Sequence, residues 1–298
     1  MKTRVFILTA AAMIAFASNS LLCRAALKQT SIDPASFTFV RILSGAVVLW
    51  LIVAIRRTFI VGAVSDRRDA SGRAHKSRLE GNWFSALALF VYAAGFSFAY
   101  VDLSAGTGAL LLFGAVQATM ILWGFTKGER LDALQIVGLA IALIGLVVLV
   151  FPGIAAPRLI GSTFMLSAGI AWGVYSLRGR SSTDAIAATT GNFLRAVPFA
   201  VVVSAVMLSK MRIDSLGITY GVVSGAITSG VGYVIWYAAL SELKALSAAT
   251  VQLSVPVLAA TGGIVLLGES ITLRYLIASI AVLGGIALVI MEKPSAES

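Results

Sequence analysis

The sequence predicts an all-α integral membrane protein whose ten transmembrane helices form two five-helix repeats of inverted topology. Three observations predict this fold: the composition, the spacing of long apolar runs, and a similarity between the two halves of the chain. Of its 298 residues, 59% are hydrophobic and 12% are charged, whereas a soluble domain carries roughly 25% charged residues. A water-soluble protein of this size could not bury so much apolar surface. The composition therefore excludes a soluble enzyme, and it also excludes a disordered chain.

Ten continuous apolar runs are long enough to cross a bilayer, since a helix needs about 20 apolar residues to span its hydrocarbon core. The runs are 5–26, 35–55, 83–102, 105–125, 133–152, 158–178, 187–208, 216–240, 245–267 and 271–291. They lack the alternation of barrel strands, so each is expected to be a helix.

Turn and charge signals separate most of the predicted helices. In order they are Asp33-Pro34, the basic stretch 56–80, Gly128-Glu129-Arg130, Phe151-Pro152-Gly153, Lys210 to Asp214, and Gly268-Glu269-Ser270. Almost no linker separates 83–102 from 105–125, or 216–240 from 245–267. The first run also fits a cleavable signal peptide, because basic residues precede it and Ala15-Phe16-Ala17 comes before Ser18. The internal repeat favours a retained helix.

The basic residues predict the orientation of the helices. If the N-terminus is cytoplasmic, fifteen Lys and Arg residues lie in the inside segments and five in the outside loops. Because cytoplasmic loops carry the excess of positive charge, both termini are predicted to be cytoplasmic. The densest basic stretch is the loop 56–80, which we expect to contact anionic lipid headgroups rather than nucleic acid.

The two halves of the chain align in three blocks. Residues 12–24 match 168–180 without gaps, with six of thirteen positions identical. In the second helices, Phe39 and Arg41 fall on Phe193 and Arg195. Near the fourth and fifth helices, Gly128-Glu129 and Gly145 fall on Gly268-Glu269 and Gly285. The halves are thus predicted as 1–153 and 154–298. Because each holds an odd number of helices, the second is inverted in the membrane, as is common in secondary transporters; a channel or a duplicated structural bundle could share this arrangement.

Short motifs spread over both halves carry a family resemblance. They are Ser18-Asn19 through Leu27, Asp33-Pro34 with Phe37 and Arg41, Gly128 to Leu131 leading to Gly138 and Gly145, Ala171-Trp172-Gly173, Gly232-Tyr233 with Trp236-Tyr237, and Pro256 before Gly268-Glu269. In this ordered set the chain resembles the drug/metabolite transporter superfamily, specifically its ten-helix EamA-like members. One departure is Val116, which the repeat pairs with Pro256, so a helix break is expected only in the second half.

The resemblance implies a carrier in the bacterial inner membrane that exports small metabolites from a cavity between its halves. Amino acids, aromatic or hydrophobic ones in particular, are the substrate class it suggests. The main alternative is a multidrug or organic-cation exporter, since an uncharged aromatic pocket can hold a flat cation. A channel or a membrane-embedded enzyme are further alternatives, although no span has an Asp, Glu or His near its centre to act as a general base.

Polar and aromatic side chains inside the spans are the candidates for lining this cavity, because such groups need partners or water within a bilayer. They are Asn19, Ser20, Arg41, Tyr92, Phe96, Tyr100, Gln117, Trp172, Tyr175, Asn192, Ser229, Tyr233, Trp236, Tyr237 and Gln252. Any one of them could instead bond to a neighbouring helix, at about 0.6 kcal/mol per pair.

The charged and reactive residues limit the mechanism. Arg41 and Arg195 could bind a substrate carboxylate, or pair with a loop acid or helix-end carbonyls, while Arg24 is expected to snorkel. All thirteen acidic residues lie in loops or at helix ends, which predicts a carrier without a carboxylate proton relay. With a single cysteine, Cys23, and a single histidine, His75, neither a metal site nor a cofactor is expected.

Overall fold

The computed structural model describes residues 3–65, 80–126, 128, 132–151, 156–179, 182, 184–240, 242–243 and 251–290, and all regular elements in this part of the chain are helical. The helices are α1 (Thr3–Gln29), α2 (Pro34–Ser65), α3 (Trp83–Ala99), α4 (Ala105–Thr126), α5 (Ala133–Val150), α6 (Leu159–Gly179), α7 (Ala185–Val206), the 3-10 helix η1 (Leu208–Lys210), α8 (Ser215–Val222), the π-helix η2 (Val223–Val231), α9 (Gly232–Leu240), α11 (Ser254–Leu267) and α12 (Leu273–Ile290).

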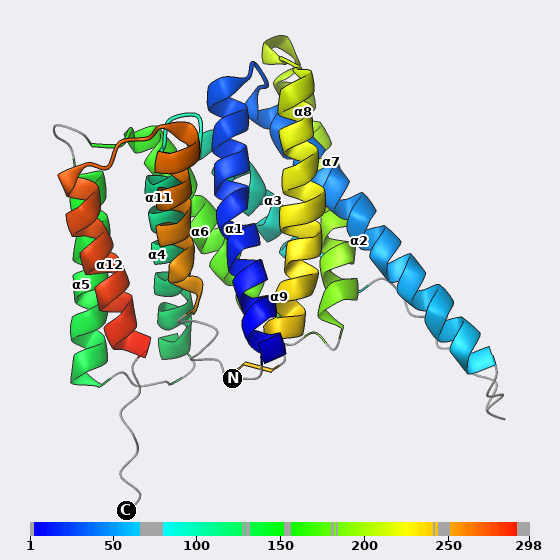
Figure 1. The fold of residues 1–298 in the computed structure, drawn as a ribbon, viewed down its shortest axis with the longest axis horizontal. Helices are drawn as coiled ribbons and strands as arrows, with labels where there is room; N and C mark the ends of the chain where they lie inside the picture. The colour runs from blue at the N-terminus through cyan, green and yellow to red at the C-terminus, as the bar shows by residue number, and fades with distance from the viewer. Residues whose placement is uncertain are drawn as a thin grey trace, which may run out of the picture.

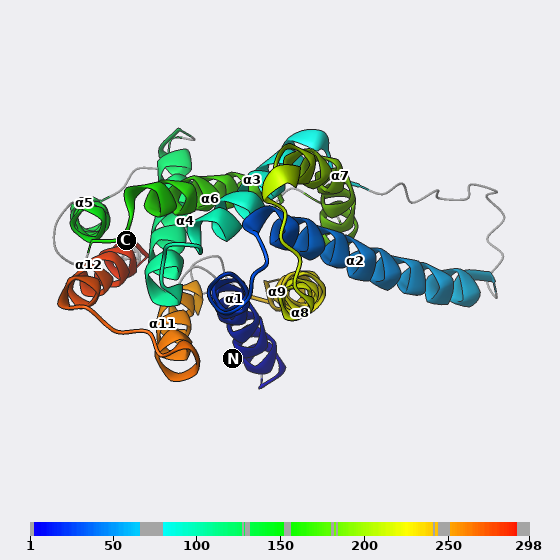
Figure 2. The same ribbon diagram turned by 90° about the horizontal axis from the view of Figure 1, so that it is seen from above.

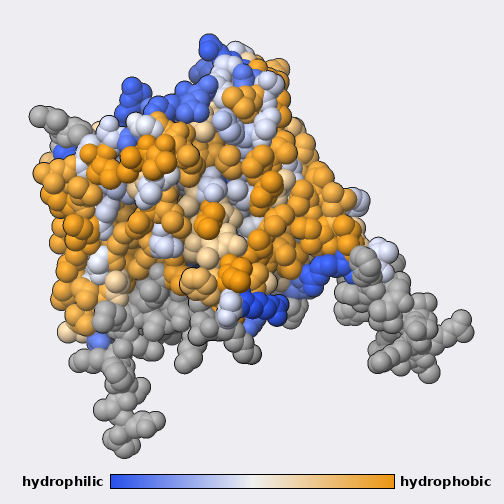
Figure 3. All heavy atoms as spheres, in the orientation of Figure 1, coloured by the Kyte–Doolittle hydropathy of each residue, from blue (hydrophilic) through white to orange (hydrophobic). Residues whose placement is uncertain are grey.

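The helices have the length and composition of membrane spans. Seven are long and apolar enough to cross a bilayer: Thr3–Gln29, Pro34–Arg56, Ala105–Gly124, Ala133–Val150, Leu159–Gly179, Ala185–Val206 and Ser215–Leu240. Trp83–Ala99, Ser254–Leu267 and Leu273–Val289 are shorter apolar helices. Apolar side chains cover the middle of the surface in Figure 3, and hydrophilic ones gather toward its two ends. The protein is therefore a multi-pass membrane protein.

The basic stretch predicted as the loop 56–80 is partly helical, because α2 continues to Ser65 and extends beyond the bundle (Figure 1). No proline interrupts the sequence between Pro34 and Ser65, and each residue added to an existing helix gains one backbone hydrogen bond. Residues 66–79, which hold most of the predicted headgroup-binding charge, lie outside the described residues.

Acidic residues begin several of the helices. Asp33, Asp132, Asp184 and Asp214 each accept hydrogen bonds from backbone N–H groups of the first turn of α2, α5, α7 and α8. A carboxylate in this position satisfies an unpaired N–H group and opposes the helix dipole. These caps explain why the aspartates are found at helix ends rather than in the spans.

The eighth predicted span, 216–240, is not one regular helix. It contains the π-helix η2, between α8 and α9. A Cβ on Gly225, within η2, would overlap the carbonyl oxygen of Arg41, so the backbone of η2 lies directly against α2. Such π-helical segments are often found at functional sites.

The proline asymmetry has the expected effect. Helix α4 continues through Val116, whereas α11 begins at Ser254, so that Pro256 lies in its first turn, where a missing N–H group is tolerated. Residues 244–250, the first part of the predicted span 245–267, lie outside the described residues.

Figure 2 shows the helices from above, where helices far apart in the sequence lie side by side. Helix α2 packs on α7 and η2, α3 and α4 pack on α6, and α1 packs on α9, η2 and α11. Helices α5 and α12 form a close pair at one side of the bundle. Their contact depends on glycine, since a Cβ on Gly138 would lie 2.6 Å from the carbonyl oxygen of Gly285. Small residues of this kind let the backbones of membrane helices approach each other.

Candidate functional site

A small cavity lies in the centre of the bundle, between α1, α3, α4, α6, η2 and α9. Its volume is about 20 Å³, and its lining residues are Phe16, Asn19, Ser20, Tyr92, Phe96, Leu112, Phe113, Trp172, Thr228 and Tyr233. We call this space the central cavity. A space of this size holds about one water molecule, so the bundle is closed around it in this conformation.

Aromatic rings form a continuous cluster around the central cavity. The Tyr92 ring lies 5.6 Å from Phe96 and 4.7 Å from Trp172, measured between ring centroids, and Trp172 lies 5.2 Å from Tyr233. Phe16 completes the cluster with edge contacts to Tyr233 and Trp236. Rings at these separations attract each other beyond their apolar burial. Together they make a wall suited to a flat or apolar group.

A hydrogen-bond network crosses the cavity from α1 to α3 and η2. The Asn19 side chain donates to the Tyr92 hydroxyl at 3.4 Å, and its carbonyl oxygen accepts bonds from Ser224 at 2.6 Å and Thr228 at 3.2 Å. Both the NH2 group and the carbonyl oxygen of the Asn19 side chain therefore have partners. Its position is fixed from both sides, as is expected for a buried amide in a bilayer.

Arg41 lies directly behind the wall of the central cavity. Its side chain is buried, with 2% of the residue exposed, and its Nη2 donates to the Tyr92 hydroxyl at 3.0 Å. Its Nε donates to Ser229 at 3.4 Å. The guanidinium carbon lies 4.7 Å from the ring centroid of Phe96 and 5.2 Å from that of Tyr92. The cation is thus held between two aromatic residues of the cavity.

The structure does not bring all the predicted site residues into the central cavity. Asn19, Ser20, Tyr92, Phe96, Trp172 and Tyr233 line it, and Arg41 and Trp236 contact its lining. Ser229 lies one step further out, where it accepts a hydrogen bond from Arg41. Tyr100 packs behind Phe96 and donates to the Ala105 carbonyl oxygen. Gln117 is buried in α4, outside the set of lining residues, and Tyr237 and Gln252 are half-buried in α9 and just before α11.

Tyr175 and Asn192 line a second cavity, of about 190 Å³, between Glu80–Asn82, the end of α6 and the start of α7. We call it the α6–α7 cavity. Trp172 stacks on Tyr175 with their ring centroids 5.4 Å apart, so the aromatic cluster reaches from the central cavity to the α6–α7 cavity.

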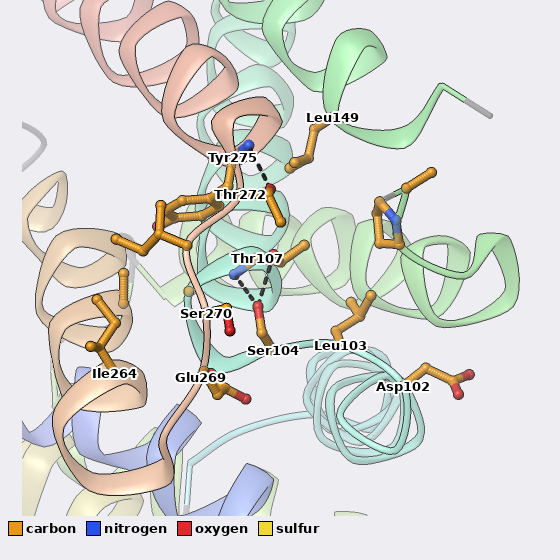
Figure 4. Close-up of a pocket in the computed structure, with 15 residues that line it drawn as sticks. Asp102, Leu103, Ser104, Thr107, Leu149, Ile264, Glu269, Ser270, Thr272 and Tyr275 are labelled. Atoms are coloured by element: carbon orange, nitrogen blue, oxygen red, sulfur yellow. Dashed lines mark hydrogen bonds between the residues drawn. The ribbon is translucent and has the colours of Figure 1, made fainter. Parts of the chain in front are cut away.

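A third cavity, of about 240 Å³, is shown in Figure 4. We call it the loop-side cavity, because the α3–α4 turn and the α11–α12 loop line much of it. Ser104, Thr107, Glu269, Ser270 and Tyr275 are among its lining residues. No sequence signal had indicated this cavity, since its lining comes from four separate stretches of the chain.

The other two arginines in the spans have acceptors. Arg24, expected to snorkel, instead forms an ion pair with Glu269 and donates to the carbonyl oxygens of Tyr100 and Val101. Arg195 donates to the carbonyl oxygens of Gly191, within α7, and of Glu80, before α3. Arg24 therefore joins α1 to the turn after α3, and Arg195 joins α7 to the segment before α3.

Sequence reasoning missed Phe16, Leu112, Phe113, Ser224 and Thr228 as parts of the site. The apolar members cannot be told from core residues in a sequence that is 59% hydrophobic. Ser224 and Thr228 could have been found from their i, i+4 spacing, which places them on one face of a helix.

A model of the EamA-like transporter family matches residues 159–291 of this chain. An uncharacterized protein of Pseudomonas aeruginosa, PA1977, is 50% identical over 97% of this chain and 96% of its own length. An uncharacterized transporter of Clostridium kluyveri is 26% identical over 95% of this chain and 91% of its own. A probable amino-acid metabolite efflux pump of Salmonella typhimurium is 27% identical, over 61% of this chain and 66% of its own.

A solved structure titled "Crystal structure of protein" has the same fold. Its TM-score is 0.61 at 18% identity, and the alignment covers 97% of this chain and 98% of that one.

Proposed function

Because the chain belongs to the EamA-like transporter family of the drug/metabolite transporter superfamily, we propose that it is a secondary carrier that exports small amphipathic metabolites. Amino acids with an aromatic or hydrophobic side chain are the proposed substrates, and alternating access around the central cavity is the proposed mechanism. Two relatives at 26% and 27% identity are named probable amino-acid metabolite efflux pumps, which supports this substrate class.

The observation that carries the proposal is the closed cavity walled by aromatic rings and reached by polar groups of four helices. Tyr92, Trp172 and Tyr233 supply flat faces, and Asn19 and Thr228 supply hydrogen-bonding groups. Ligand sites are mostly apolar, with a few polar groups that fix orientation. An amphipathic molecule is the kind of ligand that this combination suits. Since the cavity has room for about one water molecule, substrate would enter only after the helices around it move apart.

We further propose that ten helices cross the membrane, as inverted repeats 1–153 and 154–298. The packing supports this division, because contacts between two helices recur between the helices that correspond to them in the other repeat. Helix α3 packs on α6, as α9 packs on α1, and α4 packs on α6, as α11 packs on α1. The mates α2 and α7, and the mates α5 and α12, pack on each other. Two equivalent halves of opposite orientation give a carrier two equivalent open states.

The charge distribution supports the remaining parts of the proposal. We place both termini in the cytoplasm of a bacterial cell and the protein in its inner membrane, because the inside segments then hold fifteen of the basic residues in loops and the outside loops five. The basic stretch 56–80 is proposed to contact anionic headgroups. Transport is proposed to run without a carboxylate proton relay, since four aspartates of the described residues cap helices and Asp102 pairs with Arg158.

Counterflow in proteoliposomes tests this function. Purified protein is reconstituted with an unlabelled aromatic amino acid inside, and uptake of the labelled compound is measured against a panel of other amino acids. A carrier shows transient, saturable accumulation of label. A linear, non-saturating flux would indicate a channel, and an absence of exchange for every amino acid would contradict the proposed substrate.

Trp172→Ala is the matched variant for this assay, because Trp172 joins the rings of Tyr92 and Tyr233. We expect it to fold and to exchange substrate more slowly. Trp83→Ala serves as the control, since Trp83 is 58% exposed at the start of α3, away from the cavity lining. Equal loss in both variants would contradict a substrate role for the central cavity.

A further inference from the structure

The structure contains a buried cation without an anionic partner. All five N–H groups of an arginine side chain are donors, yet Arg41 uses only Nε and Nη2, on Ser229 and Tyr92. Its Nη1 is fully enclosed and has no hydrogen-bond partner. In the part of the chain that the structure describes, Arg41 forms no ion pair, unlike Arg4, Arg24 and Arg158. Arg41 is therefore a positive charge inside the bundle with an unfilled donor.

Such a charge is costly inside a membrane protein and is usually functional. The aromatic faces of Phe96 and Tyr92 offset part of that cost through cation–π attraction. They do not supply an acceptor for Nη1. An enclosed N–H group without an acceptor also has a cost, about 1–3 kcal/mol and more for a charged group. A bound anion would offset both the cost of the buried charge and the cost of the unpaired N–H group.

The repeat offers an internal comparison. Arg195 falls on Arg41 in the alignment of the two halves, and its Nη1 donates to two backbone carbonyl oxygens. Arg24, also in a span, has a carboxylate and two carbonyl oxygens. Of these three arginines, Arg41 alone keeps an enclosed nitrogen without a partner, and it alone touches the lining of the central cavity. A structural role would account for the first two, but it leaves Nη1 of Arg41 unexplained.

We propose that Arg41, with the Tyr92 hydroxyl bound to it, is the anion-recognition group of this cavity, and that the substrate carries a carboxylate. The proposal rests on the proposed function, in which the central cavity is the substrate site. The guanidinium would form charge-assisted hydrogen bonds to the carboxylate, and the Tyr92 hydroxyl would donate a hydrogen bond to it. The apolar part of the substrate would lie against Phe96 and Trp172. The positive charge of Arg41 would disfavour the organic cations of the alternative function.

Movement of the helices is a condition of this binding, because Tyr92 and Phe96 separate the guanidinium from the cavity in the closed conformation. The backbone of η2 lies against α2 at Arg41 through Gly225, and η2 supplies Ser229, the acceptor for Nε. A shift of η2 relative to α2 would therefore expose Arg41 to the cavity without requiring a change in either repeat's fold.

Counterflow of labelled L-phenylalanine, with three competitors, tests the proposal. They are 3-phenylpropionate, which keeps the carboxylate, phenylalaninamide, which keeps the amine, and 3-phenylpropanamide, which has neither charge. We expect the acid to compete at least about tenfold better than either amide, since a hydrogen bond to a charged group contributes about 1.5–3 kcal/mol. Arg41→Gln should remove this preference. Equal competition by acid and amides in the wild type would overturn the proposal.

Two further variants keep the test independent of folding. Arg41→Lys retains the charge and should retain part of the preference, although lysine lacks the bidentate geometry. Arg195→Gln removes the repeat-related arginine and should keep the full preference for acids, even if less protein folds. A preference that survives in folded Arg41→Gln protein, judged by gel filtration, or that is lost equally in Arg195→Gln, would overturn the role of Arg41.

The proposed function can fail separately from this inference. If L-phenylalanine is not exchanged, tryptophan fluorescence of the purified protein is titrated with 3-phenylpropionate and 3-phenylpropanamide. Binding of the acid alone, abolished by Arg41→Gln, would support the anion site while contradicting amino-acid export. Equal binding of acid and amide, or binding of neither, would overturn the anion site.

Discussion

Arg24 and Glu269 form an ion pair of 3.0 Å between two residues that are 245 positions apart in the chain. Arg24 also donates to the carbonyl oxygens of Tyr100 and Val101 after α3, and Glu269 accepts the N–H group of Ala105 at the start of α4. One pair of side chains therefore joins α1, the α3–α4 turn and the α11–α12 loop. It closes the bundle beside the loop-side cavity, which Glu269 lines.

Glu269→Gln is expected to lower the free energy of unfolding by about 3 kcal/mol, because it leaves the charge of Arg24 buried without its partner. Both side chains are largely buried, at 13% and 8% exposure. Thermal unfolding of the purified protein in detergent measures the change. The control is Arg158→Ala, since the Arg158 side chain is 80% exposed in its pair with Asp102 and such pairs contribute about 1 kcal/mol at most. Similar losses in the two variants would contradict this prediction.

Gly138→Ala is expected to destabilise the α5–α12 pair, because the new Cβ would lie 2.6 Å from the carbonyl oxygen of Gly285. Overpacking of this kind typically costs about 1–3 kcal/mol. Gly284→Ala is the matched control: it lies on α12, and its Cβ would meet nothing within 4 Å. We expect a lower Tm for the first variant and an equal or higher Tm for the second, since alanine is the better helix former. A lower Tm for Gly284→Ala alone would contradict the packing.

Asp33 is expected to make the wild type sensitive to acid. Burial raises the pKa of Asp33, but hydrogen bonds from Ser36, Arg212 and Ala35 outweigh it and hold the pKa below its usual 3.8. Because the folded-state pKa is the lower one, its contribution to stability is present above 3.8 and is lost as the pH falls through the folded value.

Asp33→Asn isolates this charge, since asparagine also caps helices. We expect a lower Tm than the wild type at pH 7 and a difference that shrinks below pH 3.8. A difference that is constant with pH would show that the charge of Asp33 does not contribute.

Counterflow is expected to be unchanged when an imposed pH gradient is collapsed by a protonophore. The physical reason is that Asp33, Asp132, Asp184 and Asp214 cap helices, while Asp102 and Glu269 are held in ion pairs. None of these carboxylates is placed to carry a proton across the bilayer. The measurement compares exchange with and without the gradient in one batch of proteoliposomes. Exchange that requires the gradient would contradict the prediction.

The spans could be predicted closely from sequence because bilayer thickness sets their length. For the run 105–125, the structure places α4 at Ala105–Thr126. The extension of α2 to Ser65 was missed, since basic residues such as Arg56 indicate a loop only by their charge, and charge does not end a helix. The π-helix η2 was also missed, because the hydropathy of the run 216–240 does not distinguish a π-helix from an α-helix.

The candidate site could be predicted by residue type but not by position. Polar groups in a bilayer must face the interior, which identified Asn19, Tyr92 and Arg41. The same rule could not separate these residues from Asn192, which lines the α6–α7 cavity. Both cavities lie inside the protein, so a polar side chain in either one satisfies the rule.

The sequence by itself determined that this is a helical membrane protein of a transporter family, since apolar run length and motif order are properties of the chain alone. Only the tertiary structure decided which charged side chains are paired. Arg24, Arg41 and Arg195 look alike in their spans, yet Arg24 meets Glu269 from the far end of the chain and Arg195 meets helix carbonyls. Arg41 meets aromatic faces and keeps an enclosed donor unfilled. The electrostatic energy of a cation depends on the distance to its partners, and helix packing sets those distances.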